Sequence, residues 1–422
     1  MKKIYKAQIL YTKERHRFEV LENGYVAVGD DGRVTGVATD LASLDTEGAE
    51  VVDLGDRLLI PAMNDLHVHA SQYRNQGIAM DLELLPWLQN YTFPEETKYA
   101  DTVYAERMYR RFVRDLWRFG TMRSCVFATS HTESTRLLMH LYREAGMGAL
   151  VGKVAMNRNC PEALSESVDD MVAGYESLMA DAASPLVRPI ITPRFVPTCT
   201  PDMLRACGQL AAKYGLPVQS HLSENKDEIA WVAELEPEST SYGDAYDRYG
   251  LFGQTPTVMA HCVWTDGDEL ELMKRRDVMV AHCPTSNFNV ASGMAPIRRF
   301  LDEGLRVGLG SDISGGHDLN IFRMMVYAIQ VSKMHYQQNH ERAFLTLSEA
   351  FWLATKAGGS FFGRVGSFEP GYEFDALVIN DSDLNSDNYS LLHRLERYIY
   401  LGDDRQIERR FCRGKEIAEP KI

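Results

Sequence analysis

The chain lacks paired cysteines and long apolar runs, and each absence excludes a class of protein. Its seven cysteines are scattered without a CxxC pair, which in a chain of 422 residues is typical of reduced thiols in the cytoplasm. No run approaches the roughly 20 apolar residues that a membrane helix needs, and charges directly follow the short apolar stretch at the N-terminus. We therefore expect a cytoplasmic protein without a signal peptide or membrane anchor.

Positive charge is also scarce. The 45 lysines and arginines are outnumbered by 59 aspartates and glutamates, which gives a formal net charge of −14. Because such a surface repels a phosphate backbone, we expect no nucleic-acid partner. A small uncharged substrate is compatible with this charge. The chain is 45% hydrophobic, which suffices for a large buried core.

Short, mostly apolar runs recur along the middle of the chain, with helix-like segments between them. They are Leu58–His69, Thr121–Ala128, Ala149–Met156, Arg188–Phe195, Leu216–Ser223, Thr257–Cys262, Val278–Cys283 and Arg306–Asp312. Each run has the length and composition of a strand buried on both faces. The helical segments include Asp101–Phe119, which ends at Gly120, and the shorter Asp266–Arg276 and Pro296–Glu303. Eight alternations of strand and helix predict an α/β fold with a (β/α)8 barrel.

The two ends of the chain have a different pattern. The segment GYVAVGDDGRVTGV near the N-terminus alternates as a hairpin does around an Asp-Gly turn, and VGSFEPGYEFDALVIN and RQIERRFCRGKEI near the C-terminus are also strand-like. We predict a small β-domain formed by residues 1–60 and 366–422, attached to a barrel of residues 61–365. Thr346 and Glu349 predict a capping box for a helix that leads back to this domain and stops at Gly358-Gly359. An open doubly wound sheet is the alternative fold, but the glycine-rich phosphate loop that usually follows its first strand is missing.

Histidines and one aspartate stand at the ends of the predicted strands. His67 and His69 end the first strand, where residues two apart point to the same side. His221 ends the fifth strand, His261 the sixth and Asp312 the eighth. A lone His-x-His pair or a Gly-Ser-Asp turn is weak evidence for a site. All of these residues at one end of one barrel predict a metal site, because catalytic groups of a barrel gather at that end.

The residue types indicate which metal to expect. Three histidines and one carboxylate suit zinc, with an open position for a water molecule whose pKa falls to about 7. Iron(II) suits the same ligands.

Several motifs resemble the amidohydrolase superfamily. They are PAMNDLHVHASQY (61–73), QSHLSENKDE (219–228), VMAHC (258–262), AHCPTSN (281–287) and GLGSD (308–312). More narrowly, HASQY, WLQNYTFPEE (87–96), VGKVAMN (151–157), ITPRF (191–195), QSHLSEN and YLGDDRQIE (400–408) look like the guanine deaminase family. The resemblance implies a distorted TIM barrel with a β-sandwich from both termini, a homodimer, and zinc-dependent hydrolysis of guanine to xanthine and ammonia.

The same resemblance implies roles for individual residues. The metal ligands are His67, His69, His221 and Asp312. The substrate contacts are Gln72, Arg194, Phe195, His221, Glu224 and Asp312. The residues that move protons or orient water are Glu224, His261 and Asp312, whereas His282 has a structural role. A planar guanidinium is a common partner for O6 and N7 of guanine, which suits Arg194.

One absence bears on the number of metal ions. Amidohydrolases with two metals usually bridge them with a carboxylated lysine that ends the fourth strand. Here that strand ends Thr192-Pro193-Arg194, and Lys153 in the third strand is expected to be a packing residue or one that supports the ligands from behind. We therefore expect one metal ion per chain.

Three other functions remain open at this point. The first is a related deaminase or chlorohydrolase that acts on another purine, cytosine or a triazine. The second is a pseudoenzyme scaffold with the barrel fold, although such proteins tend to lose metal ligands and all four are present. The third is a metal-dependent binding or transport protein, in which Glu224 and His261 have no task.

Overall fold

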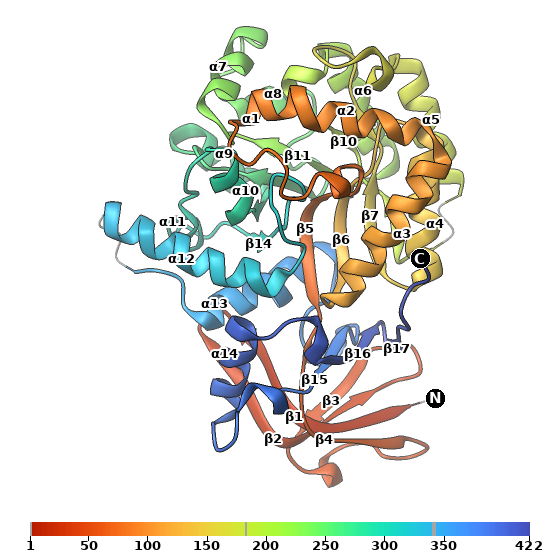
Figure 1. The fold of residues 1–422 in the computed structure, drawn as a ribbon, viewed down its shortest axis with the longest axis vertical. Coiled ribbons are helices and arrows are strands. Elements are labelled where there is room, and N and C mark those ends of the chain that lie inside the picture. Colours follow the sequence, from red (N-terminus) through yellow and green to blue (C-terminus); the bar gives the residue numbers. More distant parts are fainter. Residues whose placement is uncertain (1, 182–183, 340–342) are drawn as a thin grey trace.

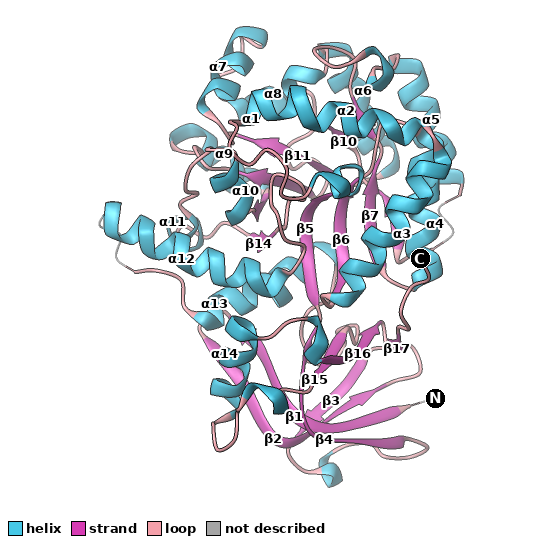
Figure 2. Ribbon diagram, in the orientation of Figure 1, coloured by secondary structure: helices cyan, strands magenta, loops and turns pink. Residues whose placement is uncertain are grey.

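The structure is a computed structural model that describes residues 2–181, 184–339 and 343–422. Figure 1 shows a barrel of parallel strands surrounded by helices, and a separate sheet built from both ends of the chain. The strands of these two parts form separate groups in Figure 2.

The predicted apolar runs supply the eight strand positions of the barrel. The strands are β5 (Met63–His69), β6 (Thr121–Phe127), β7 (Gly148–Gly152), β9 (Val187–Pro189), β11 (Val218–Leu222), β12 (Thr257–His261), β13 (Met279–His282) and β14 (Val307–Leu309). Two four-stranded parallel sheets, β5-β6-β7-β9 and β11-β12-β13-β14, meet at both edges. At one edge the N–H of Gln219 donates to the Ile191 carbonyl at 2.9 Å, and at the other the N–H of Asp312 donates to the His67 carbonyl at 2.8 Å. These bonds close the ring of strands, so the predicted barrel is confirmed.

The fourth run is not one continuous strand. Arg188–Phe195 is divided between β9 and β10 (Thr192–Pro193), and β10 pairs with β8 (Val154–Ala155). Proline has no N–H to donate to a ladder, and both Pro189 and Pro193 lie in this run. The barrel is therefore irregular at the strand that carries Arg194.

The first run also crosses a boundary. The prediction that Leu58–His69 is a single barrel strand is wrong, because β4 (Glu50–Pro61) ends before β5 begins. Leu58, Leu59 and Ile60 are fully buried, but they pair with strands of the terminal sheet. Both sheets need apolar residues here, so composition alone does not separate them.

Helices follow the strands around the barrel. They are α3 (Thr102–Arg118), α4 (Thr132–Ala145), α5 (Val168–Ala180), α6 (Pro201–Tyr214), α7 (Lys226–Leu235), α8 (Tyr242–Arg248), α9 (Gly267–Arg276), α10 (Pro284–Asn289), α11 (Ile297–Asp302) and α12 (Ile321–Asn339). The predicted helix at 101–119 is confirmed: the Asp101 side chain accepts from the N–H of Val103, and Gly120 follows with a φ of +75°. Two short helices, α1 (Leu84–Trp87) and α2 (Phe93–Glu96), lie across the upper end of the barrel in Figure 1.

The capping box at Thr346 and Glu349 is present at the start of α13 (Leu347–Trp352). The predicted stop at Gly358-Gly359 is wrong, because both glycines have helical φ angles and a short 3-10 turn, Ser360–Phe362, follows them. A Cβ on Gly308 would lie 2.9 Å from the Cα of Gly358. The small residues here permit close packing of a barrel strand against the helix.

Both ends of the chain form one seven-stranded sheet with the order β17-β16-β15-β4-β1-β2-β3. Its other strands are β1 (Lys3–Glu14), β2 (Arg17–Val28), β3 (Val34–Ala38), β15 (Ala376–Ile379), β16 (Ile407–Cys412) and β17 (Lys415–Glu416), and α14 (Leu391–Leu401) lies between β15 and β16 in the sequence. Antiparallel pairing of β15 with β4 joins the two ends, as the sequence predicts. The sheet has its own hydrophobic cluster, which includes Tyr5, Phe374 and Phe411. We keep the domain limits 1–60, 61–365 and 366–422 as a proposal.

Among the described residues, no helix has both the length and the apolar character required to cross a membrane.

Candidate active site

Four side chains converge at the carboxyl end of the barrel strands. The Nε2 atoms of His67 and His69, both on β5, are 3.3 Å apart. The Nε2 of His69 is also 3.2 Å from the Nε2 of His221 on β11. Oδ1 of Asp312, which follows β14, lies 3.2 Å from Nε2 of His67 and 3.5 Å from Nε2 of His69. The structure thus brings together the four residues that the sequence predicts as metal ligands.

These spacings fit nitrogen ligands that share one metal ion. With Zn–N bonds of 2.0–2.1 Å, tetrahedral geometry separates two ligand nitrogens by about 3.3 Å. The nitrogens of His69 lie at 3.3 and 3.2 Å from those of its two neighbours. The donor set therefore matches the size and chemistry of a zinc site.

The histidines are in the form that binds a metal. Burial lowers the pKa of His69 and of His221 well below the usual value, so both imidazoles are neutral at neutral pH. Nδ1 of His221 donates to the backbone carbonyl of Arg194 at 2.6 Å. This bond fixes the tautomer and directs the free lone pair of Nε2 into the cluster.

Residues at the ends of three barrel strands adopt a left-handed backbone. His261 has a φ of +72°, Asp312 of +48° and Ser223 of +45°. Residues other than glycine rarely adopt this region, and where they do, the strain is often found at functional sites. The strained backbone here turns the chain directly after the strands that carry the cluster.

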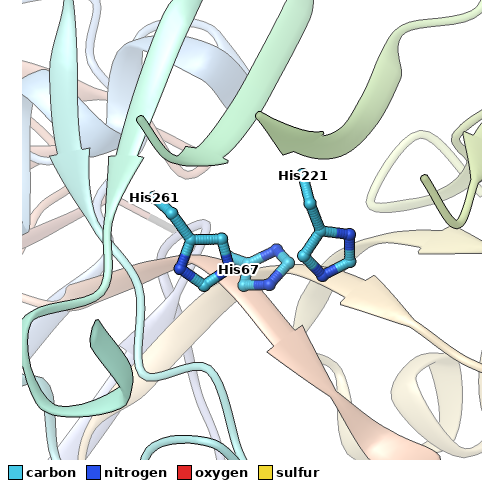
Figure 3. A group of neighbouring side chains, drawn as sticks. All are labelled: His67, His221 and His261. Atoms are coloured by element: carbon cyan, nitrogen blue, oxygen red, sulfur yellow. The ribbon is translucent and has the colours of Figure 1, made fainter. Parts of the chain in front are cut away.

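Glu224 and His261 lie beside the four predicted ligands. Figure 3 shows the rings of His67, His221 and His261 turned toward one another from different strands. Nε2 of His261 is 3.5 Å from Oε2 of Glu224 and 3.7 Å from Oδ2 of Asp312. Burial and the nearby Asp312 carboxylate raise the pKa of Glu224 to about 8. Glu224 is therefore mostly protonated at pH 7 and can donate a proton.

A buried pocket opens beside this cluster. It is lined by His69, Gln72, Leu84, Trp87, Leu88, Arg194, Phe195, His221, Glu224, Glu228, His261 and Asp312. All of the predicted substrate contacts line it. Its apolar lining comes from α1 and the residue after it, which supply Leu84, Trp87 and Leu88, and from Phe195 after β10.

Two of the predicted substrate contacts, Arg194 and Gln72, are linked through Glu96, a residue for which the sequence predicted no role. Nη1 of Arg194 donates to Oε2 of Glu96 at 2.6 Å, and Nε2 of Gln72 donates to Oε1 of Glu96 at 2.8 Å. The Arg194 guanidinium also lies 5.0 Å from the centroid of the Phe93 ring. Glu96 is the last residue of the motif WLQNYTFPEE, which resembles the guanine deaminase family but predicted no role for this glutamate.

Two further residues, for which the sequence predicted no role, support the site. Oδ1 of Asn287 accepts from Nδ1 of His261 at 2.9 Å, so it orients that ring. The hydroxyl of Ser292 donates to Oε1 of Glu224 at 3.1 Å. Asn287 closes the motif AHCPTSN, which was the available signal for it.

Lys153 and His282 do not line the pocket. The Lys153 ammonium is buried and pairs with Glu166, in agreement with the expected packing role. Neither ring nitrogen of His282 has a hydrogen-bond partner among the described residues, and burial lowers its pKa to about 3. The structural role predicted for His282 stays a prediction.

Comparison with known proteins agrees with this geometry. Residues 58–417 match the amidohydrolase family. The chain is 36% identical to guanine deaminase of Dictyostelium discoideum, over 98% of each chain, and 34% identical to that of Homo sapiens, over 95% of this chain and 93% of the other. It is also similar to a crystal structure of guanine deaminase from C. acetobutylicum with bound guanine in the active site. The TM-score is 0.97 and the identity 50%, over 99% of this chain and 100% of the other. The chain therefore belongs to the amidohydrolase family of metal-dependent hydrolases and, within it, to the guanine deaminase family.

Proposed function

We propose that this protein hydrolyses guanine at C2 and releases xanthine and ammonia. The observation that carries the proposal is one pocket in which Glu224 and Arg194 lie beside a cluster of side chains that can hold a metal ion. Relatives across the whole length of the chain are guanine deaminases, and one similar structure holds guanine in its active site.

His67, His69, His221 and Asp312 would hold one zinc ion. Zinc held there would act as a Lewis acid and lower the pKa of a water molecule to about 7. The residue after β10 is Arg194 rather than a lysine, which supports one ion per chain. Iron(II) is the alternative ion for the same ligands.

Asp312 and His261 would prepare the water for attack. Oδ2 of Asp312 and Nε2 of His261 are 3.7 Å apart, so one water molecule can contact both. The Asp312 carboxylate would accept the proton of that water. Asn287 holds the His261 ring in place from its far side, which keeps Nε2 directed at the water.

Glu224 would supply the proton to the base. It is protonated at neutral pH because its pKa is raised to about 8. Its carboxyl would donate to the ring nitrogen next to C2, which makes that carbon more electrophilic. After water adds to C2, Asp312 would pass the water proton to the amino group, which leaves as ammonia, and the Glu224 carboxylate would take the proton of the new C2 hydroxyl, which gives the C2 carbonyl of xanthine. A positioned acid of this kind contributes roughly 10²–10⁴-fold to the rate.

Arg194, Gln72 and Phe195 would hold the purine. The Arg194 guanidinium has five N–H donors, of which one bonds Glu96, so others remain for O6 and N7 of guanine. Gln72 also retains an amide hydrogen after bonding Glu96. Phe195 is 5% exposed and supplies an apolar wall for the base.

The direct test is a substrate panel with zinc-loaded protein. Guanine, adenine, cytosine and a chlorinated triazine are each incubated with the protein, and ammonia, chloride and the heterocyclic product are quantified. We expect guanine to give xanthine and ammonia in equal amounts and the others to react far more slowly. A better rate with cytosine or the triazine contradicts the proposal. The homodimer that the family resemblance implies stays a prediction, which sedimentation of the same sample measures.

A further inference from the structure

We infer that Glu96 is a positioning residue that couples the two polar substrate contacts, Arg194 and Gln72, and sets the selectivity for the O6 edge of the base. The inference deepens the proposed function and rests on it. Glu96 does not line the pocket, so it acts on the substrate through the side chains that it holds.

The geometry uses both oxygens of the Glu96 carboxylate. Oε2 accepts from Arg194 at 2.6 Å and Oε1 accepts from Gln72 at 2.8 Å. Both partners are donors and each bonds a different oxygen, which suits a carboxylate and not an amide, whose nitrogen is itself a donor. Glu96 is 2% exposed, and little solvent competes for these bonds.

The remaining bonds of Gln72 show how tightly this residue is fixed. Its Oε1 accepts from the backbone N–H of Ser314 at 3.0 Å, while Nε2 donates to Glu96. These two bonds define which end of the amide is oxygen and which is nitrogen. The second hydrogen on Nε2 is not used by these bonds, and Gln72 lines the pocket.

The charge of Glu96 matters as much as its shape. Arg194 is 2% exposed, and a guanidinium buried without a partner is costly. Glu96 neutralises it with a close contact, and in the described part of the chain the hydrogen bonds of the Arg194 side chain go to Glu96. The pair presents donors to an uncharged base without a net charge, which suits a neutral purine.

The neighbouring residue provides a matched control. Glu95 is 3% exposed, as buried as Glu96, and comes from the same short helix. Its carboxylate accepts from Lys98 at 2.6 Å and from the Tyr104 hydroxyl, and neither partner lines the pocket. Loss of charge at Glu95 therefore disturbs the same segment without touching Arg194.

The test measures binding of two unreactive purines by calorimetry. Hypoxanthine carries the O6 and N7 atoms of guanine without its 2-amino group, and purine lacks O6 as well. In Glu96→Gln, the amide offers one acceptor where two are needed. Hypoxanthine affinity should fall by about ten- to a hundredfold, from the loss of a buried charge-assisted bond. Purine affinity should change much less, and Glu95→Gln should bind both as the wild type does.

A double-mutant cycle with Arg194→Met separates coupling from general damage. If Glu96 acts through Arg194 and Gln72, the loss of hypoxanthine affinity in the double variant should be smaller than the product of the two single losses. Losses that multiply, or equal losses for hypoxanthine and purine, overturn the inference. Glu96→Asp keeps the charge on a shorter side chain, so it should also bind hypoxanthine more weakly than the wild type. It replaces Glu96→Gln in the test if that variant does not fold. Unchanged affinity in Glu96→Gln, or in Glu96→Asp where only that variant folds, overturns the inference.

Guanine turnover by the wild type is measured in parallel. A wild type that binds hypoxanthine but does not deaminate guanine contradicts the proposed function and leaves the coupling intact. If the wild type deaminates guanine but Glu96→Gln binds hypoxanthine as tightly as the wild type, the coupling is overturned and the proposed function stands.

Discussion

The backbone carbonyl of Arg194 accepts a hydrogen bond from Nδ1 of His221 at 2.6 Å, while the Arg194 side chain is directed to Glu96. One residue thus orients a proposed metal ligand with its backbone and contacts the proposed substrate with its side chain. Since the backbone bond survives substitution of the side chain, the two roles can be tested separately.

The metal site makes the first prediction. Purified protein should carry close to one zinc ion per chain by elemental analysis, and His67→Ala should lose metal and activity together. His16 is a suitable control because its side chain is 63% exposed, so His16→Ala should retain both. Two ions per chain in active protein would contradict the argument from the missing lysine after the fourth strand.

Glu224→Gln separates proton transfer from metal binding. The amide keeps the shape of the side chain but cannot deliver a proton, so the turnover rate should fall by about 10²–10⁴ while zinc remains bound. Loss of zinc in this variant would move Glu224 into the ligand set.

The same glutamate predicts a dependence on pH. Because the pKa of Glu224 is raised to about 8, its acid form is present at pH 7 and is lost as the pH rises through that value. Plots of kcat/KM against pH for the wild type should therefore fall on the alkaline side of about 8. In Glu224→Gln the residual rate should lack that fall, and its persistence would assign the ionisation to another group.

Arg194 is expected to read the O6 edge of the base. Arg194→Lys keeps the charge but not the planar fork, so guanine should bind more weakly. Arg194→Met leaves buried polar groups unpaired at about 1–3 kcal/mol each, a loss of roughly ten- to a few-hundred-fold in kcat/KM. The base 2-aminopurine lacks O6 and should lose much less, while zinc content stays unchanged.

Arg205→Met serves as the control for Arg194, since the Arg205 side chain is 55% exposed and pairs with Asp202 on the surface. Equal losses for guanine and 2-aminopurine would mean that Arg194 has a structural role only. Gln72 would then be the next residue to test for selectivity.

The sequence predicts the barrel and the metal cluster well for physical reasons. Strands buried on both faces leave apolar runs, and residues at their carboxyl ends meet at one face, so His67 and His221 are found together although 154 positions separate their numbers. The terminal strands are also recognisable from their alternation and turns.

Other features depend on tertiary packing that no local pattern reveals. Glu96 and Arg194 are 98 residues apart, and Glu96 lies in a segment of very short helices that has no clear periodicity. Gly358 has the residue type of a helix stop but serves close packing against Gly308. Leu59 is as apolar as a barrel residue, yet it belongs to the terminal sheet.

The central claim is that water replaces the amino group at C2 of guanine. The most direct test is turnover of guanine by zinc-loaded protein in H₂¹⁸O, with the xanthine analysed by mass spectrometry. We expect one ¹⁸O atom in each new xanthine, located at C2, and one ammonia released for each. Absence of xanthine, or xanthine without the label, would contradict the account.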